Sequence, residues 1–340
     1  MNKTTPQIPA DFDFVEKTYS IYGKSVQSNY PMPLPEVEAS KPDVTFAFEG
    51  IVPKSEDRPP NKRGRIWRKE NNGWLLRYYN SLGHMNEFRF LKSGTAITFT
   101  QSWPEWRDTL FALMNPVMAA SVTLQGEPVL HSSSLVLNGK ATLVMGISGA
   151  GKSSLSAALA ANGLSVHSDD IGVIEWNKGN IPLVMSGYPR IKIDTNLEKY
   201  LNIPGLSFIS ITKEIDYAGV PDHTAAQLQK AGQEKWLSAK HFPGGFHAGA
   251  APLNAILILD ERIKEITKPC IELLRPMKAG MALTEHMYGR DWLNPPGPKT
   301  LKVSTRLAES VPVYKINMPD NLDILLDSAA YIKKEILEHS

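Results

Sequence analysis

A stretch of eight residues, Gly146–Ser153, restricts the fold of this chain more than any other feature. It reads GISGAGKS and satisfies the pattern G-x-x-x-x-G-K-[ST] of a phosphate-binding loop. An apolar run at 141–145 precedes the loop, and an Ala/Leu-rich segment follows it as far as Gly163. Glycines let backbone N–H groups converge on an anion, so the pattern predicts a strand, a loop and a helix within an α/β domain.

Each position of the loop has an expected role. Lys152 is expected to reach the β- and γ-phosphates of ATP, and the hydroxyl of Ser153 to ligate Mg²⁺. The N-terminus of the following helix should point at the same anion. ATP and Mg²⁺ are therefore the expected cofactors, and the remaining phosphate contacts should come from Gly146, Ser148, Gly149, Ala150, Gly151 and Ser154.

Two adjacent acids, Asp169 and Asp170, follow the next predicted strand, at Leu164–Val166. Strand, loop, helix and strand form one βαβ unit, so the acids should lie at the sheet edge that carries the loop. A kinase needs one carboxylate to accept the proton of the acceptor hydroxyl, and another acid for the metal. Asp169 is thus a candidate metal ligand beside Ser153. A solvated turn or a helix cap is the alternative for this pair.

Five further side chains are weaker candidates. His131 opens a strand before the loop, and Arg190 and Lys192 alternate onto one face of a later strand. His286 and Arg290 are four residues apart on a predicted helix and would share a face. Basic residues suit a phosphate or a substrate carboxylate. Each also has an ordinary explanation: a buried histidine, a solvated strand edge or a surface helix face.

Composition changes along the chain predict three parts. Residues 1–42 are Pro-rich and polar, which predicts an extended arm with a short helix near Phe12–Tyr19. Residues 43–124 predict a β-rich domain closed by a helix that Pro116 kinks. Residues 125–340 contain the phosphate loop and predict the nucleotide-binding domain.

Short β-like runs in the middle part predict an antiparallel meander; they lie at Val44–Phe48, Trp74–Tyr79, Glu87–Phe90 and Ala96–Thr100. Of these, Trp74–Tyr79 is expected to be exposed and to pair with an extended peptide. The basic run Lys62–Lys69 is expected to be a solvated loop rather than a nucleic-acid site, because the domain is not strongly basic.

The C-terminal part mixes strands and helices. Strands are predicted at Ser133–Leu137, Gly172–Trp176, Leu183–Met185, Ile191–Ile193, Ala255–Leu259 and Ile271–Leu274. Helices are predicted at Thr195–Leu201, Met277–Met287 and Leu322–Glu338. Residues 213–240 have little apolar periodicity and predict either a substrate lid or a surface loop. Cys270 has no clustered Cys or His partner, which predicts a small core residue.

Charge and cysteine content narrow the class of protein. The net charge of the 340 residues is +2, so it indicates neither nucleic acid nor a membrane surface as a partner. A single cysteine excludes an intrachain disulfide. Together with an N-terminus that has no apolar signal region, this indicates a cytoplasmic protein. A homo-oligomer stays open.

The segment from Leu130 to Ile174 resembles the C-terminal catalytic domain of HPr serine kinases, which is related to phosphoenolpyruvate carboxykinases. The shared order is a His-Ser strand, a hairpin, a phosphate loop and an Asp-Asp pair. The resemblance implies that Asp170 is the general base, that Asp169 manages metal and geometry, and that His131 lies close to the site. It implies an α/β fold of HPr-kinase and carboxykinase type.

Two features differ from that family. Ser154 stands where HPr kinases usually have Glu, and the N-terminal half looks unlike theirs. Gly187-Tyr-Pro-Arg190 and the W-x-x-W segment at Trp103 resemble instead the related kinases of bacterial biosynthetic clusters, some of which phosphorylate the C-terminal residue of lasso-peptide precursors. The substrate this implies is a peptide rather than HPr.

The expected function is therefore transfer of the γ-phosphoryl group of ATP to a hydroxyl, in particular a serine of a peptide or protein. Two other functions stay open. One is a nucleotide-gated binding or regulatory protein, and the other is a kinase for an amino acid or sugar. The acid pair favours an enzyme, and the large N-terminal part favours a macromolecular substrate.

Overall fold

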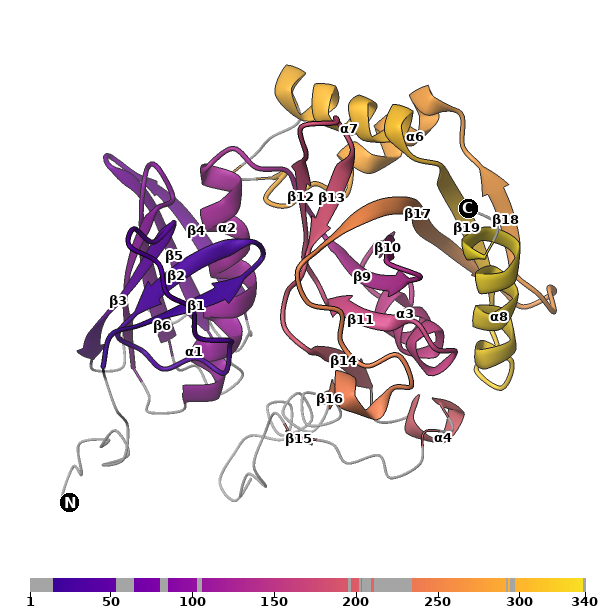
Figure 1. Cartoon of the computed structure of the whole chain (residues 1–340), viewed down its shortest axis with the longest axis horizontal. Coiled ribbons are helices and arrows are strands. Elements are labelled where there is room, and N and C mark those ends of the chain that lie inside the picture. The colour runs from indigo at the N-terminus through magenta and orange to yellow at the C-terminus, as the bar shows by residue number, and fades with distance from the viewer. Residues whose placement is uncertain are drawn as a thin grey trace. The chain divides into compact units, whose positions relative to one another are not determined.

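The computed structural model describes these parts of the chain: residues 15–52, 64–79, 85–102, 106–194, 197–201, 203, 209–210, 234–291, 293 and 297–338. These residues form two compact units, and the boundary between the units lies between Gly126 and Glu127 (Figure 1). The fold is mixed α/β, with three sheets in the described residues.

Some expectations fall on residues outside this description. They concern the start of the arm at residues 1–14, the basic residues Lys62 and Arg63, the tryptophan at 103, the helix start at 195–196 and most of the segment 213–240. These expectations stay untested.

Unit 1 contains one sheet of seven strands in the order β1-β2-β3-β7-β6-β5-β4. Most neighbours are antiparallel, but β3 runs parallel to both β2 and β7. The strands are β1 (Lys17–Ile21), β2 (Lys24–Ser28), β3 (Val44–Ile51), β4 (Gly64–Glu70), β5 (Gly73–Tyr79), β6 (Met85–Leu91) and β7 (Ala96–Gln101). The predicted antiparallel meander is confirmed for β5 to β7. Strand β3 does not belong to it, and the basic run that was expected to be a solvated loop forms strand β4 from Gly64 onward.

The predicted helix near Phe12–Tyr19 is wrong from Lys17 onward, where the chain forms β1. Tyr19 and Ile21 are buried while their neighbours are more exposed, which is the two-residue period of a strand. The supposed extended arm thus contributes the hairpin β1–β2 to the sheet. The proline-rich residues around Pro35 follow this hairpin.

The exposed edge expected at Trp74–Tyr79 is also wrong. This strand, β5, is hydrogen-bonded to β4 on one side and to β6 on the other. Five of its seven residues are buried, with Leu76 and Tyr78 in the core. An interior strand has no free backbone groups for a peptide, so β5 cannot bind one by strand addition.

The helix predicted to close the β-rich domain, with a kink at Pro116, is confirmed. It consists of three consecutive pieces: α1 (Trp106–Ala112), a π-helical turn η1 (Leu113–Val117) and α2 (Met118–Leu124). Pro116 lies inside the π-turn, because its nitrogen cannot donate a helical hydrogen bond. The helix packs closely on the sheet. Ser121 donates its hydroxyl to the carbonyl of Gly94, in the turn between β6 and β7.

Unit 2 contains a nine-stranded sheet, with its main path in the order β11-β9-β10-β17-β13-β12-β8 and with β19 and β18 added beyond β17. Its strands are β8 (Val129–Leu130), β9 (Ser132–Leu137), β10 (Lys140–Gly146), β11 (Ser165–Ser168), β12 (Gly172–Trp176), β13 (Pro182–Met185), β17 (Ala250–Ile263), β18 (Cys270–Leu273) and β19 (Val313–Pro319). A smaller sheet contains β14 (Arg190–Asp194), β16 (Glu234–Ser238) and β15 (Ile209–Ser210).

Helices cover both faces of the larger sheet (Figure 1). On one face α3 (Lys152–Ala161) and α8 (Leu325–Ile332) pack against Val144, Leu257 and Ile316. On the other, α6 (Pro276–Thr284) and α7 (Pro298–Ser310) pack against Leu143, Ile256 and Val313. The shorter pieces are α4 (Glu198–Leu201), η3 (Ala239–His241) and η4 (Lys333–Leu337). The sequence did not predict β19 or α7.

Cys270 corrects a further expectation, because it begins β18 with its side chain exposed rather than in the core. Strand β18 follows a turn, and Cys270 pairs there with Asn317 of β19. The side chain of Cys270 lies away from the buried face of the sheet. None of the helices in the described residues has the length and apolar character needed to cross a membrane.

Candidate functional site

Strand direction brings the candidate residues to one edge of the larger sheet. Strands β10 and β17 are parallel, as are β17 and β19. Strand β9 is antiparallel to both β10 and β11, so β11 runs in the direction of β10. The carboxyl ends of β10, β11, β17 and β19 therefore share an edge with the start of β9, as in open α/β sheets that bind ligands there.

The phosphate-loop sequence forms the predicted strand, loop and helix from β10 into α3. Gly151, at the N-cap of α3, has a left-handed φ of 100°, and Gly149 has φ 86°. A Cβ on Gly146 would lie 2.8 Å from the carbonyl oxygen of Leu259. These glycines are therefore required by backbone conformation and by close packing. The loop leaves the first N–H groups of α3 available to an anion.

Lys152, the first residue of α3, is buried. Its ammonium donates hydrogen bonds to the carbonyls of Gly146 (2.9 Å) and Ile147 (3.3 Å). Burial lowers the pKa of Lys152, and the negative charges of Asp170 and Asp169 oppose that shift. The ammonium of Lys152 thus contacts the phosphate loop, and the charges of Asp169 and Asp170 act on it. Its two partners are neutral carbonyls, which a phosphate oxygen can replace.

Asp169 follows β11 and is fully buried. Its Oδ1 accepts a hydrogen bond from the hydroxyl of Ser133 (2.7 Å), and its Oδ2 accepts one from the backbone N–H of Lys192 (2.8 Å). Burial, and next the charge of Asp170, raise the pKa of Asp169 to about 7. Each oxygen accepts one hydrogen bond from the protein, so Asp169 is held in place, and its predicted metal ligation stays a prediction.

Asp170 is half-buried and has a left-handed backbone, with φ 65°. Its carbonyl oxygen lies 3.1 Å from Nδ1 of His131, the residue just before β9. A left-handed conformation costs a non-glycine residue about 1 kcal/mol or more, and such strain clusters at functional sites. It turns Asp170 away from the enclosed position of Asp169, so the adjacent acids differ in environment.

His286 joins this group by a route that the sequence did not suggest. Helix α6 ends at Thr284, so His286 and Arg290 do not share a helix face and that prediction is wrong. Instead, the carbonyl of His286 accepts the backbone N–H of His131 (2.8 Å). Burial, and next the charges of Lys152 and His131, lower the pKa of His286 to about 4. Arg290 pairs with Glu285 and Asp291, both at 3.3 Å, on the surface.

Arg190 and Lys192 lie on the same face of β14, as predicted from their alternation, while Ile191 and Ile193 are buried. The N–H of Lys192 anchors Asp169, and the Lys192 charge acts on that carboxyl. Burial lowers the pKa of the Arg190 guanidinium. The strand thus places Lys192 beside Asp169, with Arg190 on the same face of the strand.

Arg262, near the end of β17, is a site residue that the sequence interpretation missed. Its guanidinium Nη2 donates to the carbonyl of Gly149 in the phosphate loop (3.1 Å). Nothing local marks this residue, because its approach depends on β17 lying next to β10. The signal for β19 was present as the alternating run 313–318 followed by Pro-Asp-Asn, a typical strand end and turn.

Comparisons with known proteins give little further guidance. No family model matches the chain, and no curated protein matches it. Among solved structures, the chain is similar to the structure of the Hpr(Ser) kinase/phosphatase from Coxiella burnetii, with 14% sequence identity and a TM-score of 0.30. That likeness covers 62% of this chain and 98% of the other. The function is therefore argued from the geometry of the site.

Proposed function

We propose that the chain is an ATP-dependent kinase that transfers the γ-phosphoryl group to a hydroxyl of a peptide or protein. One observation carries the proposal: the ammonium of Lys152, on a phosphate loop, interacts with the charges of Asp169 and Asp170 from a different strand. Phosphate binding alone does not require a carboxylate beside the loop, whereas proton removal from an acceptor does.

The phosphates would bind to the loop amides and the N-terminus of α3. Lys152 would exchange its bonds with the carbonyls of Gly146 and Ile147 for bonds with phosphate oxygens. Its lowered pKa rises again when anionic phosphates arrive, because opposite charge favours the ammonium. Neutral His286 adds no positive charge of its own at pH 7.

Asp170 would accept the proton of the acceptor hydroxyl. The acceptor oxygen then forms a bond to the γ-phosphorus, the bond from that phosphorus to the bridging oxygen breaks, and ADP leaves with the bonding electron pair. Asp169 would hold Asp170 and β14 in place through Ser133 and Lys192. His131 fixes the backbone of Asp170.

Mg²⁺ fits the hard oxygen donors of this site. The Ser153 hydroxyl would hold the ion together with phosphate oxygens, since Mg²⁺ takes few protein ligands in nucleotide sites. Such a site needs no cluster of three ligating side chains, and the described residues contain none. When bound, the ion would neutralise charge on the phosphates.

For the acceptor we propose a serine near a peptide C-terminus, such as that of a lasso-peptide precursor. Arg190 and Lys192 support this, because two cations on one face of a strand that also anchors Asp169 suit a terminal carboxylate. Strand addition to β5 is ruled out by its two neighbours.

The test is to incubate the protein with Mg-ATP and peptides that end in serine, and to look for a gain of one phosphate by mass spectrometry. Matched peptides amidated at the C-terminus should react at least about tenfold more slowly if the carboxylate is bound by two cations. Equal rates for acid and amide would remove the carboxylate from the proposal.

The same assay separates the two other functions. Efficient phosphorylation of free serine or a sugar, without peptide activity, would identify a small-molecule kinase. Tight Mg-ATP binding with no transfer to any acceptor would favour a nucleotide-gated regulatory protein, in which Asp170 has no proton to accept.

A further inference from the structure

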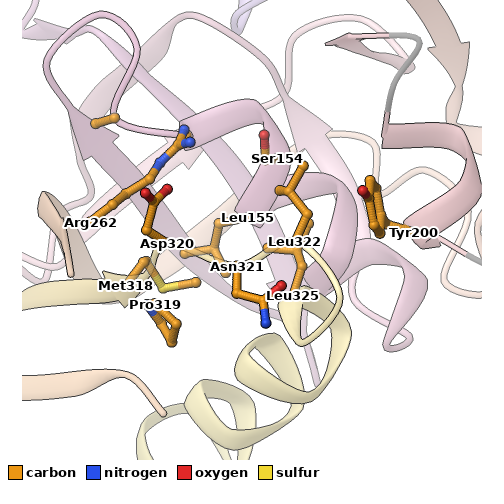
Figure 2. Close-up of a pocket in the computed structure, with 12 residues that line it drawn as sticks. Ser154, Leu155, Tyr200, Arg262, Met318, Pro319, Asp320, Asn321, Leu322 and Leu325 are labelled. Carbon is orange, nitrogen blue, oxygen red and sulfur yellow. The ribbon is translucent and has the colours of Figure 1, made fainter. Parts of the chain in front are cut away.

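A pocket of about 350 Å³ opens directly beside the phosphate loop (Figure 2). Gly151, Ser154 and Leu155 form the wall on the side of α3. The opposite wall comes from the end of β19 and from the start of α8, two elements that are more than 150 positions away in sequence. This size falls in the range of small-molecule sites.

We infer that this pocket takes the base and ribose of the nucleotide whose phosphates the loop binds. The inference rests on the proposed function and adds to it the place and the surroundings of the nucleoside. Neither the motif nor the acid pair specifies these.

Strand order supplies the first argument. In the order β11-β9-β10-β17-β19, the phosphate loop follows the central strand β10. His131 and the acids lie at the ends of β9 and β11, on one side of the loop. The pocket lies at the ends of β17 and β19, on the other side. A nucleotide with its γ-phosphate toward Asp170 therefore directs its nucleoside toward the pocket.

The lining supplies the second argument. Leu155, Met318, Leu322 and Leu325 give the pocket apolar walls suited to the faces of a flat ring (Figure 2). Five polar side chains share the lining and could orient a ligand: Ser154, Tyr200, Arg262, Asp320 and Asn321. Tyr200 lies at the end of the pocket away from Arg262.

Two polar residues directly after β19, Asp320 and Asn321, can form hydrogen bonds with the nucleoside. Oδ1 of Asn321 accepts the backbone N–H of Asp323 (2.9 Å), which fixes the amide and leaves Nδ2 as a donor. The carboxylate of Asp320 is an acceptor only. One donor and one acceptor side by side can pair with the edge of a base or with the hydroxyls of a ribose. Neither residue suits phosphate as well as the phosphate loop does.

Arg262 connects the pocket to the loop. It is the one cation among the described residues that line the pocket. Its Nη2 bonds to the carbonyl of Gly149 and would lie 3.0 Å from a Cβ on Gly151, so the guanidinium is held against the loop. From there it can bind the phosphate nearest the ribose, where a nucleotide passes from loop to pocket.

The experiment compares Mg-ATP with magnesium tripolyphosphate, which has the phosphates but no nucleoside, by calorimetry. Wild type should bind ATP at least about tenfold more tightly. Leu322→Trp fills the pocket and should weaken ATP binding about tenfold while leaving tripolyphosphate within about twofold. Leu301→Trp, at an exposed leucine of α7 outside the pocket, is the matched control and should change neither.

Asp320→Ala is a second variant. It should not disturb the folded core, because Asp320 is exposed. It should weaken ATP but not tripolyphosphate. Equal affinity of wild type for the two ligands, or unchanged ATP affinity in both pocket variants, would overturn the inference. Failure of wild type to bind either ligand would count instead against the phosphate loop and the proposed function.

Discussion

The two units bury different kinds of polar groups. Every buried polar side chain described in unit 1 is neutral, whereas unit 2 buries Lys152, His167 and Asp169. In unit 1 the hydroxyls of Tyr30 and Thr109 both donate to Oε1 of Gln101, at 3.2 and 2.7 Å. That is a satisfied neutral network, which stabilises a core without holding charge.

Burial raises the pKa of the Tyr30 phenol in unit 1, but unit 2 holds a lysine, a histidine and an acid whose charged forms burial disfavours. Burial lowers the pKa of Lys152, lowers that of His167 to about 3 and raises that of Asp169 to about 7. Such shifts reduce stability and collect at sites that do chemistry. Under the proposed function unit 2 would contain the reaction centre, whereas the described part of unit 1 buries no lysine, histidine or acid.

Lys152→Ala should have the largest effect. Transfer should fall by about a thousandfold and ATP binding should weaken, because the main cation at the phosphates is removed. The measurement is steady-state transfer together with ATP binding by calorimetry. Lys140→Ala, at an exposed lysine that begins β10, is the control and should behave as wild type. Near wild-type turnover of Lys152→Ala would contradict the proposal that the phosphate loop of unit 2 binds the nucleotide.

Asp170→Asn should reduce transfer by about a hundredfold or more while ATP binding stays largely intact, as for loss of a general base. Single-turnover transfer and ATP affinity should be measured on the same sample. If ATP affinity collapsed while turnover of bound ATP survived, Asp170 would be a metal or structural residue.

Asp169→Asn should reduce transfer by about tenfold, because one of its two acceptor oxygens becomes a donor and the hydrogen bonds from Ser133 and Lys192 cannot both be kept as they are. The variant also tests the raised pKa. A raised carboxyl pKa contributes stability below its unfolded value of about 4, and this contribution is lost as pH rises through about 7.

Wild type should therefore lose stability relative to Asp169→Asn between about pH 4 and pH 7. Denaturant unfolding across that range provides the measurement. Parallel pH profiles for the two proteins would show that burial does not disfavour the charged form of Asp169.

Gly94→Ala should affect only unit 1. Gly94 has φ 74°, and a Cβ there would lie 2.4 Å from the carbonyl oxygen of Ser121. We expect a loss of about 2 kcal/mol or more in stability. ATP affinity should be unchanged. Gly126→Ala, with φ 96° and no atom within 4 Å of its Cβ, is the control that carries backbone strain without the clash. A large loss of ATP affinity in Gly94→Ala would show that a change in unit 1 affects nucleotide binding by unit 2.

The smallest effect is expected at the basic residues of β4. Arg65 and Arg68 are exposed there, but the chain as a whole has little net charge. Arg65→Ala with Arg68→Ala should leave nucleic-acid binding unchanged and negligible. Salt-sensitive binding of duplex DNA or single-stranded RNA by wild type, at micromolar affinity or tighter, would contradict this.

Elements fixed by neighbouring residues could be predicted from the sequence. The loop and α3 follow from glycine spacing and an Ala/Leu-rich helix, and the helix around Pro116 follows from its composition. Predictions that required knowledge of a strand's neighbours did worse. Trp74–Tyr79 has the pattern of any half-buried strand, and only pairing with β4 and β6 makes it interior. Cys270 and His286 were misjudged for the same reason.

By itself, the sequence determined that Lys152 lies on a glycine loop at a helix N-terminus, because chain connectivity keeps these residues together. The tertiary structure decided the rest of the site. The order β11-β9-β10-β17-β19 places Asp170 on one side of the loop and Arg262 and Asp320 on the other. It also encloses Asp169 between Ser133 and Lys192. Such contacts join residues far apart in sequence, and their burial and pKa shifts exist only once the sheet has formed.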